Sequence, residues 1–443
     1  MTPRAEEGII GINFKRKGKY YMKKITTISA LLIGAASAFA AFPNPITTDT
    51  TAEIGSNENL VMGADNITVT HSHNGARHWT GSLDLNGFNG TNLVINNVTA
   101  DPSNYYFGFN GATFKNTGGS NADTLKVTDI GDNIYLMNGF TVSNMTMYLN
   151  TGTKLLMETT KLRTVTVKDN ASLIWSRVPD YGTSKPLNFV IGTEGSATDT
   201  SSFLNFSRES NISGLYIFNV YNGSFYLRAG YRPITFLTST IHALSADSFV
   251  YTIALNGGAT FTVDSGITNK IYIYNNITMA NNTTLVLNSE EMFYNGSVSD
   301  TKDSDGFITS SKLNKTSTRV ALYLAGATSN IILGADNTFK SITNNAGKTL
   351  NLTLNGNVFT VQENIDFSSF NLYIADFAND SVKISTTTED WAEHITAMYM
   401  GSALTDLVFR DGFLYSATVP EPAEWAMIFG ALALAVAAYR RRK

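Results

Sequence analysis

The 443-residue sequence predicts an all-β protein, with a right-handed parallel β-helix as the favoured architecture. Short segments in which apolar and polar residues alternate recur from Asn57 to Ser385, separated by Asn, Gly, Asp and Thr, whereas helical periodicity is almost absent there. The segments also return at a near-constant interval, which is 20 positions from Tyr251 to Ile271 and 19 from Ile331 to Leu350. Apolar segments that recur at a regular interval without strict sequence identity are typical of the coils of a solenoid. Each such coil cannot bury its apolar face without its neighbours.

The same segments permit an alternative, the antiparallel β-sandwich. Leu350, Leu352 and Leu354 precede Asn355-Gly356, and Asn-Gly between alternating segments is a strong signal for a tight hairpin. The interval of 20 would then span the two strands of a hairpin. The repetitive body is expected to occupy residues 41–385 under either architecture.

Composition favours an exported β protein and argues against nucleic-acid binding. Charged residues make up 15% of the chain, below the roughly 25% of a typical soluble domain. Without the basic and acidic residues of the two ends, 21 basic and 32 acidic residues remain, a net charge of −11. Such a body would repel phosphates. The absence of cysteine excludes disulfides, thiol nucleophiles and cysteine metal sites.

The N-terminal segment 22–40 has the pattern of a secretory signal peptide. Lys23 and Lys24 precede an apolar stretch, and Ala38 and Ala40 supply the small residues of a cleavage site. We therefore expect export by the secretion machinery. Residues 1–21 fit no such pattern and are expected to be a non-native extension, with translation starting at Met22.

The C-terminal segment 419–443 combines three features. Val419-Pro420-Glu421-Pro422 is followed by the apolar stretch Trp425–Tyr439 and by Arg440-Arg441-Arg442-Lys443. At 1.5 Å per residue, a 15-residue apolar helix reaches about 22 Å, short of the roughly 30 Å hydrocarbon core. It can still lodge in the membrane with the basic cluster on the cytoplasmic side. An ordinary C-terminal anchor or a buried helix are the alternatives.

These three features, on a chain that also has a signal peptide, resemble the PEP-CTERM sorting signal of Gram-negative surface proteins. The resemblance covers about the last 25 residues, and Pro420, Glu421 and Pro422 match its motif; the apolar stretch is slightly short. It implies that a membrane exosortase processes the chain for the cell surface or extracellular matrix. The Asn/Gly/Thr-rich body resembles the β-helical passenger domains of autotransporters in its general residue composition, but no fixed motif carries this resemblance.

Residues 386–418 are expected to cover the end of the solenoid. Trp391, Ile395 and Met398 have helical spacing, and Thr386–Glu389 forms a possible capping box, so a short helix is predicted. A hairpin turning at Asp411-Gly412 should follow.

Candidate catalytic and metal-binding residues are few. His71 and His73 lie on one face of a predicted strand with His78 in the following turn, and Asp303 and Asp305 crowd oxygens into one turn. We interpret them as a solvated loop and a polar surface insertion, and expect no cofactor. Glu290-Glu291 would point to opposite faces of a strand, which does not suit paired-carboxylate catalysis.

The sequence thus predicts an exported, surface-sorted structural or adhesin-like protein without catalytic activity, held transiently or stably at the membrane by its C-terminal helix. Its expected partners are the secretion machinery, an exosortase and extracellular polysaccharide, with no nucleic acid. A carbohydrate-binding or carbohydrate-cleaving enzyme on the same scaffold is the alternative.

Overall fold

The computed structural model describes residues 42–73, 77–97, 107–130, 134–150, 154–155, 163–175, 186–205, 215–227, 234–302, 308–420 and 422–441. Residues 42–443 form one compact unit, and residues 1–41 form a separate one. The predicted extension 1–21 and signal peptide 22–40, with Ala38 and Ala40, therefore lie outside the described residues.

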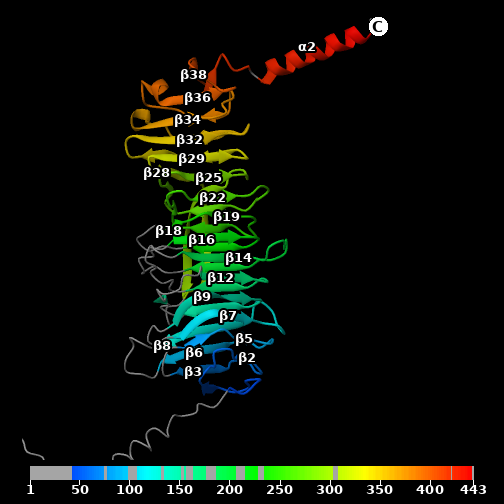
Figure 1. Cartoon of the computed structure of the whole chain (residues 1–443), viewed down its shortest axis with the longest axis vertical. Helices are drawn as coiled ribbons and strands as arrows, with labels where there is room; N and C mark the ends of the chain where they lie inside the picture. Colours follow the sequence, from blue (N-terminus) through cyan, green and yellow to red (C-terminus); the bar gives the residue numbers. More distant parts are fainter. Residues whose placement is uncertain are drawn as a thin grey trace, which may run out of the picture. The chain divides into compact units, whose positions relative to one another are not determined.

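The body is a parallel β-solenoid, as predicted, with strands stacked in sequence order (Figure 1). One face is a 12-stranded sheet whose first 11 strands are parallel, which corresponds to about 11 turns. The last strand, β27, is antiparallel to β26. The strands of this first sheet are β1 (Thr50–Ala52), β3 (Thr68–His73), β6 (Thr91–Asn97), β8 (Thr124–Ile130), β10 (Thr146–Asn150), β13 (Ser172–Trp175), β15 (Ser202–Asn205), β17 (Ser224–Leu227), β20 (Ser248–Val250), β23 (Ile271–Ile273), β26 (Phe293–Lys302) and β27 (Ile308–Arg319).

The second sheet forms another face of the solenoid and is parallel except for its last pair, β36 with β37. Its strands are β2 (Asn59–Val61), β4 (Arg77–Trp79), β5 (Ser82–Asp84), β7 (Phe107–Lys115), β9 (Ile134–Ser143), β11 (Lys154–Leu155), β12 (Arg163–Lys168), β14 (Leu187–Ile191), β16 (Leu215–Val220), β18 (Ile234–Phe236), β19 (Ser239–Ile241), β21 (Ile253–Leu255), β22 (Thr260–Val263), β24 (Asn276–Met279), β25 (Thr283–Leu287), β28 (Ala321–Leu324), β29 (Thr328–Leu333), β31 (Ile342–Asn344), β32 (Lys348–Thr353), β34 (Phe370–Ile374), β36 (Ile395–Tyr399) and β37 (Ser402–Ala403).

A third, 5-stranded sheet continues the stack and then ends it. The parallel strands β30 (Asn337–Phe339), β33 (Phe359–Val361) and β35 (Val382–Lys383) are followed by the antiparallel hairpin of β38 (Leu407–Arg410) and β39 (Phe413–Ser416). The predicted turn is confirmed, because Asp411 and Gly412 have φ of 51° and 82°, as a type I′ turn requires.

The predicted helix after Thr386 is wrong beyond a single turn. Only Trp391–His394 is helical, as a 3₁₀ turn like Phe367–Ser369, and the next residues form β36. Ile395 aligns with Leu372 of β34 in a parallel ladder. Pairing with the preceding turn of the solenoid therefore outweighed the helical spacing of the apolar residues.

Most buried apolar residues of the described strands stack into one core, and Ile174 with Tyr148 and Leu204 forms a small separate cluster. Val69, Leu93 and Val127 occupy the same column on successive turns, and none exposes any surface. Trp79 and Phe114 meet edge-to-face at 5.6 Å, an arrangement that adds about 0.5–1.5 kcal/mol to the area they bury. Functional groups are therefore expected on the outer faces and at the corners of the described turns.

Candidate functional site

The solenoid ends in a hydrogen-bonded clamp that holds Val419, the first residue of the predicted sorting motif. The buried side chain of Asn379 accepts from the Ser416 backbone N–H at 2.9 Å and donates to the backbone oxygens of Ser416 at 3.1 Å and Val419 at 2.6 Å. Val419 itself is only 3% exposed. The motif residue Val419 therefore belongs to the folded body.

Asp406 secures the same segment from the neighbouring hairpin. Its carboxylate accepts from the hydroxyls of Ser416 and Thr418 and from the Thr418 backbone N–H. The Ser416 hydroxyl bond, followed by the bonds from Thr418, lowers the pKa of Asp406 although burial opposes this. Asn379 and Asp406 together fix the chain up to the residue before Pro420.

The predicted C-terminal helix is present as α2 (Pro422–Arg441), which begins with Pro422 and ends with Arg440 and Arg441. Proline suits the first turn of a helix, and basic residues suit the last. Glu421 and Arg442 lie outside the described residues. No helix among the described residues is long and apolar enough to cross a membrane.

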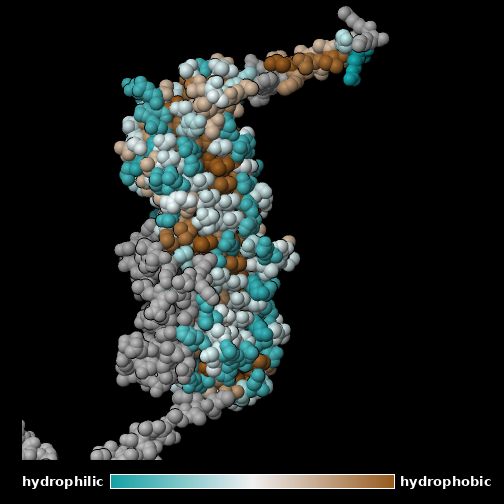
Figure 2. All heavy atoms as spheres, viewed as in Figure 1, coloured by the Kyte–Doolittle hydropathy of each residue, from teal (hydrophilic) through white to brown (hydrophobic). Residues whose placement is uncertain are grey.

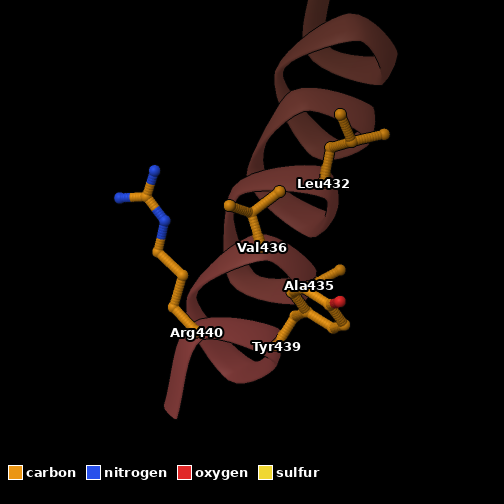
Figure 3. A pocket seen from close by; sticks show the side chains of 5 residues that line it. All are labelled: Leu432, Ala435, Val436, Tyr439 and Arg440. Carbon is orange, nitrogen blue, oxygen red and sulfur yellow. The ribbon is translucent and has the colours of Figure 1, made fainter. Parts of the chain in front are cut away.

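The apolar side chains of α2 are exposed around the whole helix. Phe429, Leu432 and Leu434 expose 62%, 61% and 73% of their surface, and the helix carries much of the brown surface in Figure 2. A shallow hollow between Leu432, Ala435, Val436, Tyr439 and Arg440 lies along one side of this helix (Figure 3). The described apolar side chains of this helix are therefore not part of the solenoid core.

The candidate metal-binding histidines are not a solvated loop, contrary to the expectation. His71 is fully buried in β3, where its Nδ1 accepts from the Ile54 backbone N–H at 2.7 Å and its ring lies 4.5 Å from Phe107. His78 is part of β4 rather than a turn. His73 also lies in β3, but its side chain is outside the described residues. Among the described residues, no group of three or more His, Asp or Glu could hold a metal ion.

The other metal candidates, Asp303 and Asp305, lie outside the described residues. They fall between β26 and β27, whose antiparallel pairing begins at Tyr294 and Arg319 and continues to Lys302 and Ile308. The antiparallel hairpin of β26 and β27 therefore interrupts the parallel sheet at the position where the polar insertion was expected.

Glu290 and Glu291 lie in the turn before β26 rather than in a strand. Glu291 has φ of 50°. Its carboxylate pairs with Arg319 at 2.9 Å and accepts from Thr338 at 2.7 Å. This carboxylate therefore anchors the base of the β26–β27 hairpin.

Two cations of that hairpin lie over a column of outward-facing tyrosines, which sequence reasoning missed. Arg319 lies 3.9 Å from the ring centre of Tyr294, and Lys315 lies 5.9 Å from that of Tyr272. Lys315 also pairs with Asp247 at 2.5 Å. The hydrogen bond to Asp247 is the main cause of the raised pKa of Lys315. Burial, and then the charge of Asp247, raises the pKa of Tyr272.

Carboxylates also fasten successive turns of the solenoid to one another. Asp199 accepts backbone N–H bonds from Asp169 and Asn170, about one turn earlier, both at 3.0 Å. Asp84 accepts from the backbone and the hydroxyl of Thr117 at 3.0 and 2.8 Å. Burial opposes the charge of each carboxylate, but the hydrogen bonds outweigh it and lower both pKa values. These carboxylates are held ionised in structural roles.

The chain matches no protein-family model, no curated protein and no solved structure.

Proposed function

We propose that this chain is an exported structural or adhesin-like protein whose β-solenoid is displayed at the cell surface or in the extracellular matrix. In this proposal the secretion machinery recognises residues 22–40, and a membrane exosortase acts at Pro420, Glu421 and Pro422. The helix α2 holds the chain at the membrane, transiently or stably, until that processing.

The exposure of α2 carries the proposal. An apolar helix exposed around its whole circumference is unstable in water and stable in lipid, where its internal hydrogen bonds satisfy the backbone. Arg440 and Arg441 at its end favour a cytoplasmic, anionic surface. The clamp at Val419 supports the same proposal, because Asn379 and Asp406 hold the chain in the folded body up to the residue before Pro420.

Catalysis is not part of the proposal. Asp84 and Asp199, two acidic side chains with lowered pKa values, accept several hydrogen bonds from neighbouring turns. A general acid needs a raised pKa, so these groups are suited to stabilising the solenoid. Release of reducing ends from polysaccharide by the purified chain would instead support the enzyme alternative.

The test is fractionation of a bacterium that produces the chain with and without an exosortase gene. Processing and surface exposure should require the exosortase gene and should be lost when Pro420, Glu421 and Pro422 are changed to alanine. Changing the exposed Thr405 to alanine is the matched control and should have no effect. Equal surface display without the enzyme, or with the altered motif, would reject the sorting proposal.

A second arm tests α2 separately. Leu432→Glu with Val436→Glu should release the unprocessed chain from the membrane fraction into the soluble fraction. The body should keep its unfolding temperature, because both side chains are exposed on α2. Continued membrane association of this variant would show that α2 is not the anchor.

A further inference from the structure

Two stacked tyrosines form an open aromatic platform at one corner of the solenoid. Tyr251 follows β20 and Tyr274 follows β23 on the next turn. Their ring centres are 4.9 Å apart and the rings are within 16° of parallel. Tyr274 exposes 52% of its surface although the corresponding side chain of the previous turn packs against it.

The stack ends at Tyr274 because the next turn has no side chain to continue it. Val250 aligns with Ile273, and Ile273 aligns with Asn295, so the column of following residues is Tyr251, Tyr274 and Gly296. A β-carbon at Gly296 would lie 2.8 Å from the side chain of Tyr272. Gly296 therefore offers no side chain to continue the stack, in agreement with the 52% exposure of Tyr274.

Described residues beside the platform include neutral hydrogen-bonding groups. Asn275 is exposed, and its amide nitrogen donates to the Thr252 hydroxyl at 3.0 Å. The Thr316 hydroxyl donates to the backbone oxygen of Asn295 at 2.7 Å, which places this residue next to the same corner. Thr316 begins an exposed irregularity of the hairpin that also contains Ser317 and Thr318.

Two described cations of the neighbouring hairpin are paired with carboxylates. Arg319 pairs with Glu291, and Lys315 pairs with Asp247. A flat ring with one open face, bordered by amides and hydroxyls, fits a ligand that has an apolar face and a polar rim. The pyranose ring of a sugar has this form, since its axial C–H groups make a face and its hydroxyls make the rim.

We propose that Tyr274, stacked on Tyr251, is a binding platform for neutral polysaccharide. Anionic polysaccharide is disfavoured, because the body has an excess of 11 acidic residues, 32 against 21. This site deepens the adhesin-like part of the proposed function and rests on it, because it names the class of ligand that the surface would bind. It is also independent of sorting, since binding by the purified chain does not require processing of the tail.

The experiment is calorimetric titration of the detergent-solubilised full chain with soluble β-glucan, mannan and xylan oligosaccharides, and with alginate as the acidic comparison. At least one neutral glycan should bind, and alginate should not. Tyr274→Ala should weaken binding about tenfold, because the stacking surface is lost, whereas Tyr274→Phe should retain it. Tyr373→Ala, at a tyrosine of β34 with 37% exposure, is the matched control and should bind normally.

Each outcome decides the proposal. Thermal unfolding should be similar for all variants, and Tyr274→Leu gives a second loss of the flat ring if the alanine variant fails to fold. The proposal is overturned if no neutral glycan binds, if alginate binds better, or if Tyr274→Ala and Tyr274→Leu bind as the natural chain does. A dimer that dissociates on Tyr274→Ala, without glycan binding, would assign the platform to a second copy and would also overturn it.

Discussion

Asn379 and Val419 are 40 positions apart in the chain, and the side-chain amide of Asn379 donates to the backbone oxygen of Val419 at 2.6 Å. This bond connects the turn after β34 to Val419, the first residue of the predicted sorting motif. Under the proposed function, an exosortase acts beyond Val419 without the solenoid having to open, because the hydrogen-bonded chain stops at that residue.

We predict that Asn379→Ala destabilises the C-terminal end of the solenoid. It would remove three hydrogen bonds from the backbone of Ser416 and Val419, although the Ser416 carbonyl keeps its bond from the Val419 N–H at 3.2 Å. The expected loss is about 2–3 kcal/mol of unfolding free energy. Hydrogen exchange should also become faster between Ser416 and Val419 than elsewhere in the body.

Asn371→Ala is the matched control for this clamp. Asn371 is exposed, and its side-chain oxygen bonds to His394 at 3.1 Å. Its removal should change the unfolding free energy by less than about 0.5 kcal/mol. Equal effects of the two substitutions would show that the Asn379 clamp does not hold the tail.

The lowered pKa values of Asp84 and Asp199 predict that the solenoid loses stability in acid. A carboxyl whose folded pKa lies below its unfolded value contributes stability that is fully present above the unfolded pKa. This contribution is lost as the pH falls through the folded pKa. The unfolding free energy should therefore be level above about pH 5 and should decrease as the pH falls through the ordinary value of 3.8 and below it.

Urea unfolding at a series of pH values would measure this effect. Asp199→Asn keeps the shape of the side chain but cannot ionise, so the variant should be less stable near neutral pH and less sensitive to acid. An unchanged acid dependence in the variant would mean that Asp199 is not one of the groups responsible.

The base of the β26–β27 hairpin should depend on Arg319. Its side chain, of which 16% is exposed, pairs with Glu291 and lies over Tyr294. Arg319→Gln removes both interactions and leaves a partly buried carboxylate, so we expect a loss of about 1–3 kcal/mol. Limited proteolysis should then cut within β27 more readily, whereas Lys312→Gln, at an exposed lysine of the same strand, should leave the cutting rate unchanged.

The solenoid could be predicted from sequence because its inward residues repeat locally. In β12, Arg163, Val165 and Val167 are buried and their neighbours are partly exposed, and this alternation is present in the sequence itself. The partners across turns were less predictable. Ile331 lies beside Leu352 rather than Leu350, and Met145 precedes β10 of the first sheet, whereas Val165 belongs to the second.

The length of a turn varies too much for a fixed interval to find these partners. From Thr50 to its partner Val69 is 19 positions, but from Leu93 to Val127 is 34. Connections at the corners change in length without disturbing the ladder, because loop length has a small effect on free energy.

Among the candidate functional residues, those that are adjacent in sequence were predicted, and those that meet only in the folded chain were not. The apolar residues of α2 and its terminal arginines are contiguous and were predicted. The Asn379 clamp joins residues 40 positions apart, and the stack of Tyr251 on Tyr274 depends on the register of two turns. The buried position of His71 also follows from its place in β3, where it aligns with Ala52 and Ile95.

Gly139 should be the glycine whose replacement tests the register of the solenoid most directly. Its φ is 92°, and a β-carbon there would lie 1.7 Å from the carbonyl oxygen of Thr164 on the next turn. Gly111→Ala is the matched control, since Gly111 has φ of 82° with open space around it. The control should lose about 1–3 kcal/mol through backbone strain alone. Gly139→Ala should lose more, because β9 and β12 must also separate, and unfolding in urea would measure the difference. Equal losses for the two variants would contradict the close approach of these strands.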